Sequence, residues 1–190
     1  MRSTVVLLTG FSVAIVGAAC SGDDDDDGAA ALTSGQYVYT VASVPADACW
    51  ESDAGFPTIG LTATLAVTVA PTSVALAAVD TAGHFVIPDD RTGPLDDDQF
   101  EGTFQDVTLH VTSACSILQG GSFSGDVTGA ETFDLTTFYG FGVATMNSGG
   151  GVSNCTNAPA NIYGGLVPFP AALRTNGTCG FGLNGTAVIP

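Results

Sequence analysis

The chain has 190 residues, of which 19 are acidic and only 3 are basic, and its formal net charge is −16. The chain contains no lysine, so it is not expected to bind nucleic acid or anionic lipid head groups, both of which require basic side chains. Such acidity is typical of a solvated, self-repelling surface, and divalent-cation binding is the alternative interpretation.

The beginning of the chain has the organisation of an export signal. Arg2 precedes the uncharged apolar segment 4–16, and small residues follow at 17–19. Residues 4–19 comprise only 16 positions, fewer than the ~20 that a helix needs to cross a bilayer. The sequence therefore predicts a cleaved signal peptide over residues 1–19 rather than a permanent transmembrane helix.

The motif Gly17-Ala18-Ala19-Cys20 resembles the lipobox of bacterial lipoproteins, although Gly17 stands where that family usually has leucine. The resemblance implies that Cys20 receives a diacylglycerol and becomes the first mature residue, anchored to a membrane. Acyl chains at about 0.8 kcal/mol per buried methylene would make this attachment nearly permanent. By the same resemblance, Ser21 is not the acidic residue that marks inner-membrane retention, so the outer membrane is expected. Ordinary signal-peptidase cleavage after Ala19, giving a secreted protein, is the alternative.

The five cysteines suit an exported protein: Cys20, Cys49, Cys115, Cys155 and Cys179. Lipidation of Cys20 would remove the odd thiol and leave four cysteines for two disulfides. None of them forms a close C-x-x-C pair, so disulfides are favoured over zinc. Strand counting places Cys49 and Cys115 at one end of the sheet, so of the three possible pairings we predict Cys49–Cys115 and Cys155–Cys179.

The domain organisation follows from composition. Residues 20–31 include the block of aspartates 23–27, which predicts an acidic, disordered tether. Residues 32–190 then form a single domain of 190 − 31 = 159 residues, enough for one sizeable core. Loss of the signal peptide would leave 2 basic and 19 acidic residues, a formal charge of −17.

The domain has the sequence pattern of an all-β protein. Apolar and polar residues alternate most clearly over 59–70, and no segment after residue 19 has a convincing helical period. Further strands are predicted at 36–44, 74–79, 84–87, 100–112, 117–124, 131–139 and 180–189. The segments 88–98 and 125–129 are predicted as an acidic loop and a turn.

These strands predict an antiparallel meander, either a lipocalin-like up-and-down barrel or a two-sheet sandwich, with two disulfides. The alternation changes phase within 100–112, which predicts a bulge near Asp106. The repeats Phe100-x-Gly102 and Phe123-x-Gly125 place glycines in strands, as a strongly curved sheet requires. This favours the barrel.

Catalytic motifs are not recognisable. The only histidines, His84 and His110, are isolated on predicted strands. The segment 121–125 resembles the serine-hydrolase elbow but has Phe123 where the nucleophilic serine should be. Acidic residues gather in one loop, beginning with Asp89 and Asp90. The best calcium candidates there are Asp96, Asp97, Asp98 and Glu101, although no cofactor is required by the sequence.

We therefore expect no enzymatic activity and predict a lipid-anchored cell-envelope protein, acting as a binding or structural module. Its partners would be the membrane, through Cys20, and a small apolar ligand or an envelope protein; nucleic acid is not expected. One alternative is a lipocalin-like carrier, whose cavity would need small inward residues such as Ala63, Ala75 and Ala77. The other is a glycan-processing enzyme using paired carboxylates.

The aromatic residues are interpreted as core and rim, with a pocket lining as the alternative: Tyr37, Tyr39, Trp50, Phe56, Phe138, Tyr139 and Phe141.

Overall fold

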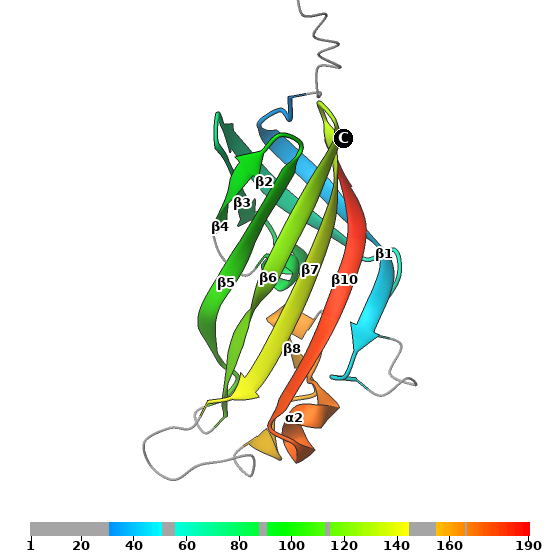
Figure 1. The fold of residues 1–190 in the computed structure, drawn as a ribbon. Helices are drawn as coiled ribbons and strands as arrows, with labels where there is room; N and C mark the ends of the chain where they lie inside the picture. Colours follow the sequence, from blue (N-terminus) through cyan, green and yellow to red (C-terminus); the bar gives the residue numbers. More distant parts are fainter. Residues whose placement is uncertain (1–30, 51–55, 88–90, 113–114, 145–154, 166) are drawn as a thin grey trace, which may run out of the picture.

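A closed antiparallel barrel forms the body of the protein in a computed structural model that describes residues 31–50, 56–87, 91–112, 115–144, 155–165 and 167–190 (Figure 1). Its strands are β1 (Gly35–Asp47), β2 (Thr62–Ala70), β3 (Ser73–Ala78), β4 (Arg91–Asp96), β5 (Gln99–His110), β6 (Ser116–Gly129), β7 (Thr132–Val143) and β10 (Thr178–Val188). Strands β1 to β7 follow one another around the barrel, and β10 closes it between β7 and β1. The predicted all-β meander is confirmed, and it is a barrel. The signal segment, Cys20, the tether, Asp89 and Asp90 lie outside the described residues.

The barrel interior is built by strict alternation along the strands. On β7, Phe133, Leu135, Thr137, Tyr139 and Phe141 are buried, whereas the residues between them face outward. The same period of two on the other strands fills the interior with aromatic rings. The buried rings on these strands are Tyr37, Tyr39, Phe100, Phe104, Phe123, Phe133, Tyr139, Phe141 and Phe181.

The two Phe-x-Gly repeats pair with each other across β5 and β6. The register places Phe100 opposite Gly125 and Gly102 opposite Phe123. A Cβ atom at Gly102 would lie 2.5 Å from Cζ of Phe123, and one at Gly125 would overlap the ring of Phe100. Each ring therefore lies over the glycine of the neighbouring strand, as expected for a curved sheet.

The strand predicted at 84–87 is wrong, because Thr81–Val86 form a helix, α1. Asp80 caps this helix: its Oδ1 accepts a hydrogen bond from the amide of Gly83 at 2.6 Å, and its Oδ2 accepts one from the amide of Thr64 at 3.0 Å. Burial alone would raise the pKa of Asp80, but these hydrogen bonds outweigh it and hold the pKa below its usual value. A helix of six residues is too short to show a helical period in the sequence.

Helix α1 packs against β2, β3 and η3, within the ring of strands in Figure 1. Phe85, Val86 and Ile87 are fully buried. The ring of Phe85 stacks nearly parallel to Tyr139 of β7, with centroids 5.7 Å apart, and to Phe181 of β10, with centroids 5.4 Å apart. The protein thus fills part of its own interior with a ring from α1.

Other predicted boundaries differ from the structure. The acidic loop predicted over 88–98 contains β4, and the turn predicted over 125–129 continues β6. The bulge is confirmed, because the β5–β6 register shifts between Phe104 and Val107. Between β7 and β10 lie β8 (Asn161–Ile162), the 3₁₀ turn η3 (Tyr163–Gly165), β9 (Val167–Pro168) and α2 (Ala171–Thr175), at the lower end of the barrel in Figure 1.

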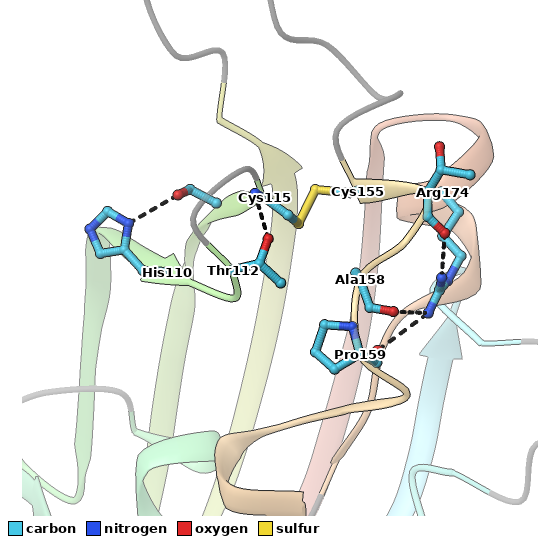
Figure 2. Close-up of a disulfide and its surroundings, with 9 residues drawn as sticks. His110, Thr112, Cys115, Cys155, Ala158, Pro159 and Arg174 are labelled. Carbon is cyan, nitrogen blue, oxygen red and sulfur yellow. Dashed lines mark hydrogen bonds between the residues drawn. A yellow bond between two sulfur atoms is a disulfide. The ribbon is translucent and has the colours of Figure 1, made fainter.

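Arg174 on α2 has a structural role in this lower segment. Its guanidinium donates hydrogen bonds to the carbonyl oxygens of Thr156, Ala158 and Pro159 (Figure 2). The guanidinium carbon also lies 4.8 Å from the ring centroid of Phe169. One of the chain's three basic residues is therefore committed to holding the 155–175 segment together.

Both disulfides form, but the predicted pairing is wrong: Cys49 pairs with Cys179, and Cys115 with Cys155. The β1–β10 register sets Asp47 opposite Phe181, so barrel closure brings Cys49 beside Cys179. Cys115 immediately precedes β6, and Cys155 lies in the segment that follows β7, the strand next to β6 (Figure 2). Cys49 and Cys115 do share one end of the barrel, but so do their actual partners.

Candidate functional site

The small inward residues expected of a carrier are mostly not inward. Ala63 is buried inside the barrel, with 2% of its surface exposed. Ala75 and Ala77 face outward, because Val74 and Leu76 take the inward positions of β3. That part of the prediction is wrong for Ala75 and Ala77, because on β3 the larger residues Val74 and Leu76 face the interior.

The aromatic residues singled out in the sequence are mainly core residues. Tyr37, Tyr39, Trp50, Tyr139 and Phe141 are buried, Phe56 is half-buried, and Phe138 is 49% exposed. Phe138 therefore differs from the other six, since its ring is on the outer surface of β7.

The interior contains a small set of polar side chains. Gln119 on β6 and Thr137 and Tyr139 on β7 occupy inward positions and are at most 1% exposed. Neither amide atom of Gln119 makes a hydrogen bond in the described part of the chain. The hydroxyls of Thr137 and Tyr139 are neighbours, and a hydrogen bond between these two side chains partly offsets the effect of burial on the pKa of Tyr139. Burial, together with the nearby hydroxyls of Tyr163 and Tyr39, raises the pKa of Tyr139 well above its usual value, so this phenol stays neutral.

A groove of about 680 Å³ crosses the outer faces of β4, β5, β6 and β7. Its polar lining is rich in hydroxyl groups, with one aromatic ring and one residue of each charge. The residues are Arg91, Thr92, Pro94, Glu101, Thr103, Ser122, Ser124, Thr136 and Phe138. Strand register builds this surface, since Glu101 pairs with Ser124, and Ser122 with Phe138.

A second hollow of about 500 Å³ continues the groove. It shares Pro94, Glu101 and Ser124 with the first and extends it toward Asp126. There the side-chain amide of Gln99 donates a 2.8 Å hydrogen bond to the Asp126 carboxylate. The two hollows together form an elongated surface with an acidic end and an end that carries Phe138.

Glycines on three neighbouring strands lie close to Phe138 on the outer face of the barrel. A Cβ atom at Gly180 would be 3.1 Å from Cζ of Phe138, so glycine lets this ring lie over β10. The register aligns Gly120, Gly140 and Gly180 in one row across β6, β7 and β10. A Cβ atom at Gly140 would meet nothing closer than 3.9 Å. The protein's own packing therefore does not require glycine at position 140.

The calcium candidates do not assemble into a metal site. Asp96, Asp97 and Asp98 are exposed in the β4–β5 hairpin, and Glu101 is exposed in the groove. Across the described ranges, no group of three or more His, Cys, Asp or Glu side chains is arranged to hold a metal ion.

The two histidines lie on different elements. His84 is on α1 rather than a strand, and its Nδ1 lies 2.8 Å from the carbonyl oxygen of Asp80. His110 is exposed at the end of β5, with Nδ1 3.0 Å from the hydroxyl of Ser116 (Figure 2). Ser116 is only 2% exposed, so its hydroxyl is shielded from a substrate.

No protein-family model matches the chain, and no curated protein or solved structure is significantly similar to it. In the part of the chain that the structure describes, no helix is long and apolar enough to span a membrane. The functional assignment therefore depends on the geometry of the barrel and of its groove.

Sequence reasoning missed the groove and the interior polar set. Apart from Arg91, the groove residues are ordinary outward positions of four strands, and only the register shows that they adjoin. Gln119 could have been noticed in the sequence, because it is a polar residue at an inward position of the predicted strand, between Ile117 and Phe123. Residues 117–124 are recognisable as a strand, and the amide at position 119 is the one polar side chain among its inward positions.

Proposed function

We propose that this protein is a lipid-anchored module of the bacterial envelope that binds an uncharged, hydroxyl-rich chain, such as an oligosaccharide, in the outer groove. The observation that carries this proposal is the groove's composition: serine and threonine hydroxyls beside the half-exposed ring of Phe138. The filled interior supports a ligand site on the outside of the barrel rather than a roomy internal one.

The chemistry of the groove matches a sugar chain. Hydroxyl groups act as both donors and acceptors, as sugar hydroxyls do. Phe138 offers an apolar face on which the C–H face of a sugar ring can lie, and the lack of a side chain at Gly140 lets a flat ligand approach beside it. Arg91 and Glu101 add charged groups whose hydrogen bonds to neutral partners are stronger than neutral ones.

The charge of the chain favours a neutral ligand. At a formal charge of −16, the protein repels polyanions over the range of the Debye length. The lipid anchor implied at Cys20 would place the groove beside the glycans of the envelope. An acidic tether at 20–31 would hold the barrel off the membrane.

The test is a glycan array followed by calorimetric titration with the detergent-solubilised mature protein. The array should retain neutral oligosaccharides, and Phe138→Ala should weaken their binding at least tenfold. Val188→Ala is the matched control, because Val188 is 41% exposed and lies outside the groove. Equal binding by wild type and Phe138→Ala would contradict the proposal. Release of shortened glycan would instead favour the enzymatic alternative, with Glu101 and Asp126 as its carboxylates.

A further inference from the structure

The polar set in the barrel interior is not explained by the outer groove. Gln119 interrupts an inward row on β6 that is otherwise apolar, between Ile117 and Phe123. Folded proteins pair nearly all buried polar groups, because an unpaired one loses its water without compensation. A leucine at position 119 would fill similar space without that loss. An amide that persists there is best explained by a ligand that it binds.

The neighbouring strand completes a polar face. The β6–β7 register sets Gln119 opposite Phe141 and Gly121 opposite Tyr139, so Gln119 and Tyr139 are diagonal neighbours on the inner wall. Thr137 is the next inward residue along β7. The face therefore offers an amide donor and an amide acceptor, neither of them hydrogen-bonded among the described residues, beside two neighbouring hydroxyls.

Parallel aromatic rings surround this face. The ring of Tyr139 is nearly parallel to Phe181, with centroids 4.8 Å apart, and lies 5.2 Å from Phe104. Phe85 joins the same stack at interplanar angles of 6° to Tyr139 and 7° to Phe181. Among these rings, Phe85 alone belongs to a helix rather than to the barrel wall. It occupies the place that a flat ligand ring would take.

We propose that the barrel interior is a second binding site, which takes a small neutral aromatic amide in place of Phe85, with Gln119 pairing to the ligand's amide group. A primary amide matches Gln119 because each presents one acceptor oxygen and one donor NH₂ group. The ligand must be neutral, since a charge would be buried without a partner among aromatic rings. Tyr139, kept neutral by burial, supplies a hydroxyl rather than a phenolate.

Access to the site runs through α1. This helix has six residues, and isolated helices of that length are marginal, so its position depends on the Asp80 cap and on the packing of Phe85, Val86 and Ile87. Local opening of such an element is far cheaper than opening the β-ladders of the wall. Withdrawal of Phe85 frees the space beside Tyr139 and Phe181 without breaking a strand pair.

The test uses ¹H–¹⁵N NMR titration of the mature protein with benzamide, and with toluene as the matched probe that lacks the amide. Benzamide should shift the side-chain NH₂ signals of Gln119. Gln119→Leu should weaken benzamide binding about tenfold, equivalent to 1.4 kcal/mol, and leave toluene binding unchanged. Thr137→Val provides a second, nearly isosteric variant in which benzamide binding should also fall.

Two further variants separate this site from the groove. Phe85→Ala should strengthen binding of both probes several-fold by vacating the ring position, whereas Phe138→Ala, in the outer groove, should change neither. Equal loss of benzamide and toluene binding in Gln119→Leu would overturn the role of the amide. Absence of any benzamide shift in both wild type and Phe85→Ala would overturn the site itself.

Discussion

Alanine at position 102 would drive a methyl group into the ring of Phe123. The Cβ atom would lie 2.5 Å from Cζ and 2.6 Å from Cε1 of that ring, whereas ordinary contacts begin near 3.4 Å, so the ring must retreat by almost an ångström. The ring has little room: Phe123 is 2% exposed, stacks 5.7 Å from Phe104, and lies 6.4 Å from Phe100.

The size of the effect follows from this confinement. Overpacking a tight core costs about 1–3 kcal/mol, and complete expulsion of a phenylalanine sets an upper bound of about 3–5 kcal/mol. Alanine recovers about 0.5–1 kcal/mol relative to glycine in a strand. We therefore expect Gly102→Ala to lower the free energy of unfolding by about 1–2 kcal/mol, equivalent to a melting temperature about 2–8 °C lower for a domain of this size.

The matched control is Gly140→Ala on the outer face. Its Cβ atom would meet nothing closer than 3.9 Å, so this variant should be as stable as wild type or up to about 1 kcal/mol more stable. Urea unfolding under oxidising conditions, followed by far-UV circular dichroism and the fluorescence of the single tryptophan, Trp50, measures both. If Gly102→Ala proved as stable as Gly140→Ala, the reciprocal Phe–Gly packing of β5 and β6 would be refuted.

Peptide mapping of the unreduced protein should find Cys49 joined to Cys179 and Cys115 joined to Cys155, and a Cys49–Cys115 peptide would contradict the barrel closure described above. Sequence separations of 130 and 40 correspond to about 5 and about 4 kcal/mol of loop entropy. Replacing the first pair with alanine should therefore destabilise the protein more than replacing the second. Asp80→Asn should be less stable than wild type at neutral pH, and the difference should vanish as the pH falls through the lowered pKa of Asp80. A difference that did not change with pH, measured by denaturation from pH 2 to 7, would mean that the carboxylate charge contributes nothing.

The local features of the fold were predictable from sequence because the alternation of apolar and polar residues along each strand indicates them directly. The strand at β2, the bulge within β5 and the role of the Phe-x-Gly repeats were all recognisable from residue order. Helix α1 was not, because six residues capped by Asp80 resemble a short strand ending a hairpin. The position of α1 inside the barrel depends on contacts between residues distant in sequence, because Phe85 stacks on rings from β7 and β10.

The disulfides and the groove depend on register between strands distant in sequence. Cys49 could be matched to Cys179 only by knowing that β10 returns to pair with β1. The groove likewise joins β4 to β7 through cross-strand pairs such as Glu101 with Ser124. Composition offers no substitute for these pairings, since serine and threonine on an outer strand face are ordinary at each position taken alone.

The orientation of the barrel links the two proposed sites. Strand β1 starts at the upper end of Figure 1, so an anchor preceding residue 31 would reach the membrane from that end. Helix α1 follows β3, which runs downward like β1, and both disulfides are at the lower end, which would face away from the membrane. An internal site opened by α1 would then be reached from the distal side, where the two disulfides hold the barrel closed while α1 moves. The groove runs along the side wall between these ends, so a long glycan could bind there without blocking that path.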